Sequence, residues 1–333
     1  MKVFFFKEDF RNVTEFYYNV ILDALKNKSV ERVMMDHCNI ITALSISKGD
    51  YVLVTTLRSF IILYLCGVRH FIYWYQGVTP EEVGLMMNSK WRFYVYSFLE
   101  RLSLKKVEYK IGVSKYLFEH FENKYKMSIN KETCFIMPCF NSLLNEASFK
   151  TLHKYDNNVF CYAGGTQAWQ GFDKILSLYS EIEKKYKNVF LKIYSKDIEN
   201  AQKLIEKANI HNFSVNSVPQ SEIDHALADC KFGFIIREDS IINNVATPTK
   251  LGTYLANGVI PIFSSSIFSF RDLSEKYNYL CCVKDDTDVI DKVKVLLEQK
   301  LNGVDIYNEY CHLFSDYYNR DNYVMELVTF FNF

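Results

Sequence analysis

Short apolar runs alternate with longer stretches of helical period along most of the chain. The runs are rich in β-branched and aromatic residues and have the length of buried strands, whereas the stretches between them repeat apolar residues at i and i+4. This alternation is typical of an α/β protein whose parallel sheets are covered by helices on both faces. In the first part of the chain we expect strands at 3–6, 32–35, 51–55, 71–75, 110–113 and 134–137, and helices at 12–26 and 116–125.

The alternation breaks after Pro138 and restarts at residue 159. In the second part we expect strands at 159–163, 190–194, 213–215, 232–236, 260–263 and 279–283, and helices at 172–186, 199–208, 221–229, 248–256 and 289–300. Because 333 residues exceed what one hydrophobic core holds, two domains are the natural expectation. We place the first domain at 1–140, a polar linker at 141–158 and the second domain at 159–312. The aromatic remainder, 313–333, is expected to form a helix that packs back on the first domain.

Composition narrows the function. Thirty-nine basic residues balance thirty-nine acidic ones, so no global field favours a nucleic-acid partner. The nine cysteines include no C-x-x-C spacing, which indicates buried thiols in a reducing compartment. The N-terminus turns polar at Lys7, and the longest apolar run, 60–68, is about half of a membrane span. We therefore expect a cytoplasmic protein, at most resting on the inner face of the cell membrane.

Two features suggest a site for an anion in the second domain. In the segment Thr247-Pro248-Thr249, threonine suits a helix N-cap and proline the first helical position, so the amides of Thr249 and Lys250 would face an anion and Lys250 would add a charge. Arg237 follows the strand 232–236, at the carboxyl edge where ligands bind in this fold class, and a guanidinium matches phosphate geometry. The alternatives are a capped helix without a ligand and an Arg237 paired with a neighbouring carboxylate.

These residues lie in a segment that resembles a known family. F-I-I-R-E-D at 234–239 followed by A-T-P-T-K-L-G-T-Y-L-A-N-G at 246–258 is similar to the strand, loop and P-T-K-L-x-E-Y-L-A-x-G helix of the GT-B glycosyltransferases, specifically the group-four retaining type of capsule and surface-polysaccharide pathways. Weaker similarities follow at Y-A-G-G (162–165), W-Q-G-F (169–172), G-V-S (112–114), Q-G-V-T-P-E-E (76–82) and I-M-P-C-F (136–140).

The resemblance implies two Rossmann-like domains that face each other across a cleft. It also implies transfer of a sugar from a nucleotide diphosphate sugar to a hydroxyl of a glycan or lipid-linked glycan, with retention of configuration and without metal or cofactor. Arg237 and Lys250 would be the catalytic groups that stabilise the leaving diphosphate. The implied donor-binding residues are Gly164, Gly165, Arg237, Glu238, Pro248, Thr249, Lys250 and Thr253, and those on the acceptor side are Gln76 and Glu81.

The chain also departs from the family pattern. Thr253 and Val245 stand where the family has two glutamates, and Gly165 and Gln170 stand where it has cations. A GT-B scaffold without catalysis, acting as a partner subunit or sugar-binding module, is therefore the main alternative. A sugar-nucleotide epimerase of the same fold also stays open, whereas a dehydrogenase is disfavoured because no G-x-G-x-x-G follows the first strand of either domain.

Two further segments invite a functional interpretation. Asp286-Thr287-Asp288 has the form of a metal-binding D-x-D, but it precedes an apolar helical pattern and is better explained as a helix cap. The stretch 90–106 interleaves basic and aromatic residues, and such a helix could rest on a membrane that carries a lipid-linked acceptor. Burial of this helix within its own domain is the interpretation that the pattern favours.

Overall fold

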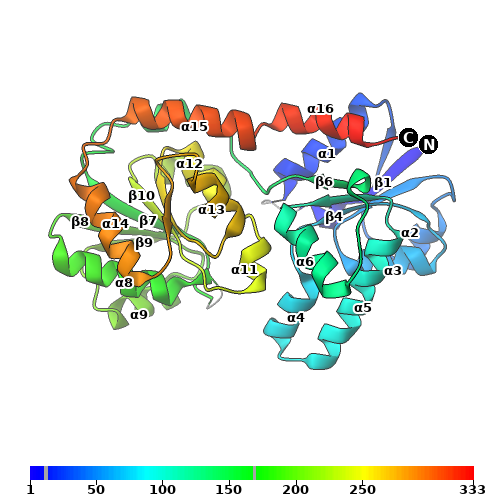
Figure 1. Cartoon of the computed structure of the whole chain (residues 1–333), viewed down its shortest axis with the longest axis horizontal. Coiled ribbons are helices and arrows are strands. Elements are labelled where there is room, and N and C mark those ends of the chain that lie inside the picture. Colours follow the sequence, from blue (N-terminus) through cyan, green and yellow to red (C-terminus); the bar gives the residue numbers. More distant parts are fainter. Residues whose placement is uncertain (11–13, 168–169) are drawn as a thin grey trace. The chain divides into compact units, whose positions relative to one another are not determined.

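The protein forms two compact units in a computed structural model that describes residues 1–10, 14–167 and 170–333 (Figure 1). Unit 1 comprises Met1–Asn141, Val245–Thr247 and Asn319–Phe333, and unit 2 comprises Ser142–Asn244 and Pro248–Tyr318. Two positions used above, the expected helix start at Asn12 and the aromatic Trp169, lie outside the described residues.

Unit 1 is built on one parallel six-stranded sheet in the order β2-β1-β3-β4-β5-β6. The strands are β1 (Lys2–Phe6), β2 (Glu31–Met35), β3 (Tyr51–Val54), β4 (His70–Tyr75), β5 (Tyr109–Gly112) and β6 (Cys134–Ile136). Each predicted strand is confirmed to within one residue at either end. These strands could be recognised in the sequence as apolar runs because β1, β3 and β4 are almost wholly buried, so both of their faces must be apolar.

Helices cover this sheet and connect its strands. They are α1 (Glu15–Asn27), α2 (Ile40–Leu44), α3 (Leu57–Leu65), α4 (Thr79–Met87), α5 (Lys90–Lys106) and α6 (Lys115–Tyr125). The predicted cap of α6 is confirmed, because the Ser114 hydroxyl accepts a hydrogen bond from the Leu117 amide at 3.1 Å. Helices α4 and α5 pack against each other as a hairpin, and Asn88 turns the chain between them in the left-handed region (φ 44°).

Unit 2 repeats the design with the sheet order β12-β11-β10-β7-β8-β9, again with parallel strands. Its strands are β7 (Asn158–Ala163), β8 (Val189–Tyr194), β9 (Phe213–Asn216), β10 (Phe232–Ile235), β11 (Ile260–Ser264) and β12 (Cys281–Val283). Its helices are α7 (Glu146–Phe149), α8 (Phe172–Lys185), α9 (Ile198–Lys207), α10 (Ile223–Leu227), α12 (Lys250–Ala256), α13 (Phe268–Ser274), α14 (Asp286–Glu298) and α15 (Gly303–Tyr317). Helix α11 (Ile241–Val245) ends where the chain passes into unit 1.

Two of the expected segments are organised differently in the structure. Of the expected linker, 141–158, residues 142–158 belong to unit 2, where they carry α7 and bury Ser148 and Phe149. The expected single C-terminal helix is two helices, because Asn319 leaves the helical region and caps a new helix, α16 (Arg320–Phe330). Helix α16 packs against α1 within unit 1, where Arg320 pairs with Asp23.

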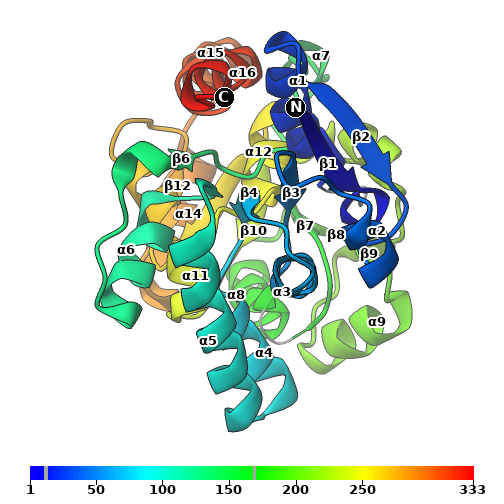
Figure 2. The same cartoon turned by 90° about the vertical axis from the view of Figure 1, so that its right-hand side faces the viewer.

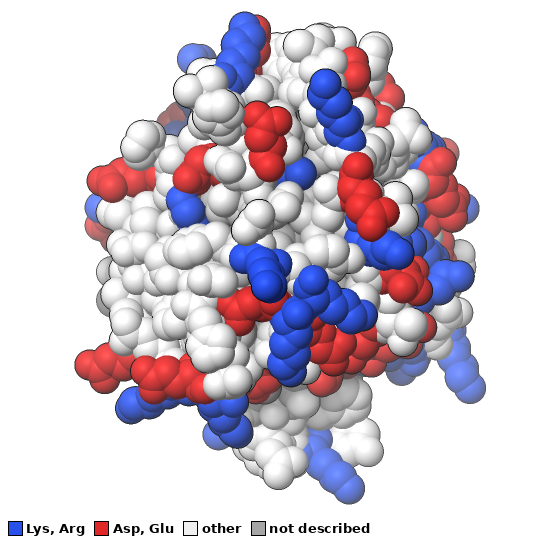
Figure 3. All heavy atoms as spheres, turned by 90° about the vertical axis from the view of Figure 1, so that its left-hand side faces the viewer, with Lys and Arg blue, Asp and Glu red and all other residues white. Residues whose placement is uncertain are grey.

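The charged surface of unit 2 is mixed. On the face seen in Figure 3, Lys and Arg side chains lie beside Asp and Glu side chains around a broad uncharged area. That arrangement agrees with the balanced composition of the chain.

A buried lysine ties the start of unit 2 to the ends of two of its helices. Lys154 is 1% exposed, and its ammonium donates to the carbonyls of Ala228 and Asn257 at 2.8 and 2.7 Å, next to α10 and α12. Asn257 is itself fully buried and bonds to Asp224 at 2.7 Å. Burial lowers the pKa of Lys154 to about 8. This network fixes the end of α12, the helix that carries Lys250.

Replacing this lysine should destabilise unit 2. We expect Lys154→Met to lower the free energy of unfolding by about 2–4 kcal/mol, since it leaves buried carbonyls without a donor. The measurement is urea unfolding. The matched control is Lys150→Met, which removes an exposed lysine paired with Glu146 on the same segment and should change stability by less than about 0.5 kcal/mol.

The pH dependence of stability distinguishes an electrostatic role of the Lys154 amine from a role in packing alone. Between the folded pKa of about 8 and the ordinary value of 10.5, the unfolded chain holds more protons at Lys154 than the folded one. The contribution of this group to stability therefore rises with pH across that window. The stability difference between wild type and Lys154→Met should grow accordingly, and a pH-independent difference would contradict the assignment.

Candidate functional site

The first candidate site lies where the strand order of unit 2 reverses. From β7 the chain proceeds to β8 and β9 on one side, and from β10 it proceeds to β11 and β12 on the other, while β7 and β10 are neighbours. Open parallel sheets bind ligands outside the carboxyl ends of their strands at such a point. Gly164 and Gly165 directly follow β7, and Arg237 follows β10 by two residues. The fold therefore brings these predicted residues to one edge.

Two cations share a single acceptor there. Arg237 Nη2 donates to Gln170 Oε1 at 2.8 Å, and Lys250 Nζ donates to the same oxygen at 3.0 Å. Lys250 also donates to the Tyr162 hydroxyl at 3.2 Å and lies 4.3 Å from the centroid of that ring. Among the described residues, no carboxylate forms an ion pair with Lys250. Two positive groups are thus held together by a neutral amide.

The surroundings of the two cations lower the pKa of each. The pKa of Lys250 is held well below its usual value, first by burial and then by the charge of Arg237. Burial also lowers the pKa of the Arg237 guanidinium, which remains a cation. A dianionic group bound beside these cations would favour the protonated form of Lys250.

Glycines make room for this arrangement. A Cβ at Gly164 would lie 2.2 Å from Lys250 Nζ, so any side chain there would displace the ammonium. A Cβ at Gly171, which has φ 69°, would lie 2.2 Å from the Ile236 carbonyl oxygen, so the start of α8 can approach the end of β10 only because residue 171 is glycine.

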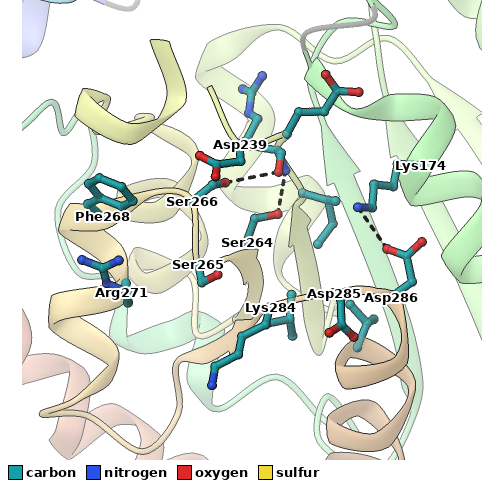
Figure 4. Close-up of a pocket in the computed structure, with 15 residues that line it drawn as sticks. Lys174, Asp239, Ser264, Ser265, Ser266, Phe268, Arg271, Lys284, Asp285 and Asp286 are labelled. Atoms are coloured by element: carbon teal, nitrogen blue, oxygen red, sulfur yellow. Dashed lines mark hydrogen bonds and ion pairs between the residues drawn. The ribbon is translucent and has the colours of Figure 1, made fainter. Parts of the chain in front are cut away.

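The backbone at Arg237 is fixed by two serines at and just after the end of the neighbouring strand β11. Its amide donates to Ser264 Oγ at 2.8 Å, and its carbonyl accepts from Ser266 Oγ at 3.2 Å (Figure 4). A cavity of about 350 Å³ opens beside these groups, at the carboxyl ends of β10, β11 and β12. Lys174 of α8 and Asp286 of α14 close one side of it with an ion pair of 3.0 Å. The polar cavity thus adjoins Arg237.

The predicted helix start at Pro248 is wrong. Helix α12 begins at Lys250, and Thr249 precedes it without a side-chain cap, while the Pro248 carbonyl accepts from the Leu251 amide. Thr247 does not cap the helix because its hydroxyl accepts the Cys139 amide at 3.0 Å within unit 1. A helix of seven residues has a weak dipole, so side-chain charge must carry most of the attraction for an anion.

Glu238 and Thr253 are two further donor-side candidates. Glu238 is exposed and lines the cavity beside Arg237. Thr253 is buried, and its hydroxyl donates to the Thr249 carbonyl one turn earlier in the chain. The position at which the resembling family has a glutamate is therefore occupied here by a side chain turned onto its own helix.

The acidic D-x-D segment is part of a helix cap. The Asp285 carboxylate accepts a hydrogen bond from the Asp288 amide at 2.9 Å, and α14 begins at Asp286. The expected helix cap is therefore confirmed, with Asp285, one residue before the segment, as the capping residue. No group of three or more histidine, cysteine, aspartate or glutamate side chains in the described part of the chain is arranged to hold a metal ion.

A second cavity, of about 450 Å³, lies in unit 1 at the carboxyl ends of β1, β3 and β4. Four carboxylates, several hydroxyls and two tyrosines surround it: Glu8, Asp9, Thr14, Thr55, Thr56, Leu57, Tyr73, Tyr75, Gln76, Gly77, Thr79, Glu82 and Glu100. Tyr73 and Tyr75 stack with ring centroids 3.9 Å apart. This cavity is the second place where the fold class expects a ligand.

Of the two predicted acceptor-side residues, only one lines this cavity. Gln76 lines the cavity, whereas Glu81 pairs with Lys124 at 2.9 Å and with His120 at 3.1 Å. Glu82 faces the cavity instead, because successive residues of a helix point about 100° apart. Burial raises the pKa of both Glu82 and Glu100. Sequence reasoning missed Glu8 and Asp9, although their position just after β1 is the signal that could have found them.

Comparison with known proteins identifies the fold. HepE from Anabaena aligns with 99% of this chain and 98% of its own at a TM-score of 0.70 and 10% identity. A trehalose-phosphate synthase from Burkholderia vietnamiensis aligns with 96% of this chain and 84% of its own at a TM-score of 0.62 and 10% identity. The chain has the GT-B fold. TarM, from S. aureus, aligns with 86% of this chain at a TM-score of 0.66 and 12% identity, and the match spans 55% of TarM.

No protein-family model matches the sequence. No curated protein matches it either. The GT-B fold is therefore established by structure alone, at identities too low to carry over an activity.

The glycine beside Lys250 provides a first test of the site. We expect Gly164→Ala to weaken binding of a nucleoside diphosphate about tenfold or more, because the new methyl group displaces the ammonium from Gln170. Calorimetric titration with UDP and GDP measures this loss. Gly49→Ala, at a position with nothing within 4 Å of the added carbon, is the control and should bind as the wild type does. Unchanged affinity in Gly164→Ala would show that Lys250 does not contribute to nucleotide binding.

Proposed function

We propose that the protein is a glycosyltransferase that moves a sugar from a nucleoside diphosphate sugar to a hydroxyl. The observation that carries this proposal is the pair of cations, Arg237 and Lys250, at the switch point of a GT-B donor-type sheet. The comparison proteins agree in chemistry, since HepE is described with UDP and glucose and TarM with UDP.

The two cations suit the charge that the reaction develops. The bond between the sugar's anomeric carbon and the diphosphate breaks, the anomeric carbon bonds to the acceptor oxygen, and the acceptor proton passes to an oxygen of the leaving diphosphate. Negative charge grows on the diphosphate, and preorganised cations stabilise that change without reorientation. Arg237 is preorganised by Gln170 and by the serines that hold its backbone. We propose that this stabilisation needs no metal and that the anomeric configuration is retained.

The acceptor, in this proposal, occupies the carboxylate-lined cavity of unit 1. Gln76, Thr55 and Glu82 can exchange hydrogen bonds with hydroxyl groups of a sugar. Glu8, Asp9 and Glu82 on this cavity disfavour an acidic acceptor, whereas Glu100 is already paired with Lys124 at 3.0 Å. We therefore propose a neutral or amino sugar, in a glycan or lipid-linked glycan of a surface polysaccharide, as the acceptor, and the cytoplasm as the place of reaction.

Nucleotide binding is the primary test of the donor site. A screen by thermal shift against UDP, GDP, dTDP, CMP and their sugars should show stabilisation by one diphosphate, about 2.7 kcal/mol at about one hundred times the dissociation constant. Arg237→Ala and Lys250→Met should each lower affinity about 10- to 100-fold, the effect of one lost charge-assisted hydrogen bond. Lys203→Ala, on α9 of the same unit, is the matched control.

Proton uptake provides a second readout of the same experiment. Because bound diphosphate should raise the depressed pKa of Lys250, binding should take up protons, measurable by calorimetry in buffers of different ionisation enthalpy. Lys250→Met should abolish that uptake. Absence of any nucleotide response would overturn the donor site and favour the catalytically inactive scaffold.

Acceptor kinetics test the cavity of unit 1. We expect Gln76→Ala and Glu82→Gln to raise the acceptor KM about tenfold, the effect of one lost hydrogen bond, while the affinity for the donor nucleotide stays unchanged. Glu81→Gln, on the adjacent position of α4, breaks the pair with Lys124 and should lower stability without changing this KM. A larger KM effect from Glu81→Gln would place the acceptor elsewhere.

A further inference from the structure

The hairpin of α4 and α5 exposes an unusual amount of apolar side chain. Its tip carries Leu85, Met86, Met87, Trp91, Tyr94, Val95 and Phe98, exposed by 43–68% of their area. Scattered single apolar residues are ordinary on protein surfaces, but a contiguous group of this size marks an interaction site. We call these seven residues the hairpin patch.

The patch is continuous because of helical geometry. Trp91, Tyr94, Val95 and Phe98 follow the spacing i, i+3, i+4, i+7 and so share one face of α5. The opposite face of α5 supplies Glu100, Ser103 and Leu104 to the interior of unit 1. The last residues of α4 lie beside the start of α5 because the two helices pack as a hairpin. Figures 1 and 2 show this hairpin extending away from the sheet of unit 1.

The charge around the patch has one sign. From residue 83 to residue 99 the sequence contains Lys90 and Arg92 but no aspartate or glutamate. The guanidinium of Arg92 lies 5.8 Å from the Trp91 ring. Arg101 and Lys105 are exposed and extend the same face of α5 by further steps of three and four residues. An apolar surface that passes into a cationic one therefore runs along a single helix.

The charge and the aromatic content of the hairpin patch distinguish between two possible binding partners, a second copy of the chain and a lipid bilayer. A second copy of the chain, docked patch to patch about a two-fold axis, would bring Lys90 and Arg92 toward their own equivalents with no acid in the hairpin tip to offset them. An anionic bilayer complements both halves of the surface, since tryptophan, tyrosine and phenylalanine settle at the interface and lysine and arginine reach the headgroups. No helix in the described part of the chain has the length and apolar character to cross a bilayer.

We propose that the hairpin patch docks the protein onto an anionic lipid surface. Trp91, Tyr94 and Phe98 enter the headgroup region, and Lys90, Arg101 and Lys105 contact lipid phosphates. Docking of this kind is peripheral and reversible, and it does not depend on the activity proposed above.

Vesicle sedimentation with the full chain tests the proposal. The wild type should bind vesicles of phosphatidylcholine with phosphatidylglycerol, and should bind about tenfold more weakly to phosphatidylcholine alone or at high salt. Trp91→Ser with Phe98→Ser should lower the partition coefficient about tenfold or more. Lys90→Gln with Lys105→Gln should lower it on anionic vesicles only.

The control removes equally exposed apolar side chains elsewhere. Leu152→Ser with Met325→Ser, at positions 81% and 62% exposed, should bind vesicles as the wild type does. Trp91→Phe should retain binding but lose the blue shift of tryptophan emission that insertion of Trp91 produces. Far-ultraviolet circular dichroism should show each variant folded, as expected for exposed positions.

Two results would overturn the proposal. One is equal vesicle binding by wild type and the Trp91→Ser, Phe98→Ser variant. The other is a wild-type protein that ignores both kinds of vesicle but sediments as a dimer that the same variant makes monomeric, which would assign the patch to a second copy of the chain.

Discussion

Two like charges held side by side at a sheet edge are the constraint around which unit 2 is arranged. Arg237 and Lys250 repel each other, yet both donate to Gln170 Oε1 within 3.0 Å. Holding two like charges side by side costs free energy, so the surrounding structure must keep both side chains in place. Here the fixing elements are Ser264 of β11 behind Arg237, the Tyr162 ring under Lys250 and the Lys154 network at the far end of α12. This fixed pair of cations is the feature on which the proposed donor site rests.

The departures from the resembling family become intelligible in these terms. Where that family has cations after the glycine turn, this chain has Gly165 and Gln170, and the amide of Gln170 now orients the two cations that remain. Where the family has a glutamate, Thr253 bonds to its own helix and offers little toward a ribose. In the proposed donor site, Arg237 and Lys250 would carry the diphosphate contacts, whereas Thr253 would not reproduce the ribose contact that the resemblance implies at that position. Discrimination among donors would accordingly rest on groups beyond this helix.

The sequence predicted the strands well and the site only in part, for physical reasons. Buried parallel strands are apolar on both faces, so each appears as a short uninterrupted run with sharp ends. The start of α12 was misplaced because Thr247 meets a distant partner, the Cys139 amide, and local capping rules cannot see such a contact. The sequence alone could not show which of Glu81 and Glu82 lines the cavity. Only the orientation of α4 decides which carboxylate faces the cavity and which pairs with Lys124. Helix α5 exposes its aromatic face and buries Glu100, Ser103 and Leu104, the reverse of the usual amphipathic arrangement, which made the exposed patch the less obvious interpretation.

The two proposals for unit 1 meet in one element. The same α4–α5 hairpin supplies Glu82 and Glu100 to the carboxylate-lined cavity and Trp91, Tyr94 and Phe98 to the hairpin patch. A bilayer in contact with the patch would lie against the outer side of the helices that form one wall of the cavity. If both proposals hold, the neutral or amino-sugar head of a lipid-linked acceptor would reach the cavity while its lipid stays in the membrane. The hairpin would then serve both: its inner face supplies carboxylates to the cavity, and its outer face supplies the aromatic residues that meet the bilayer.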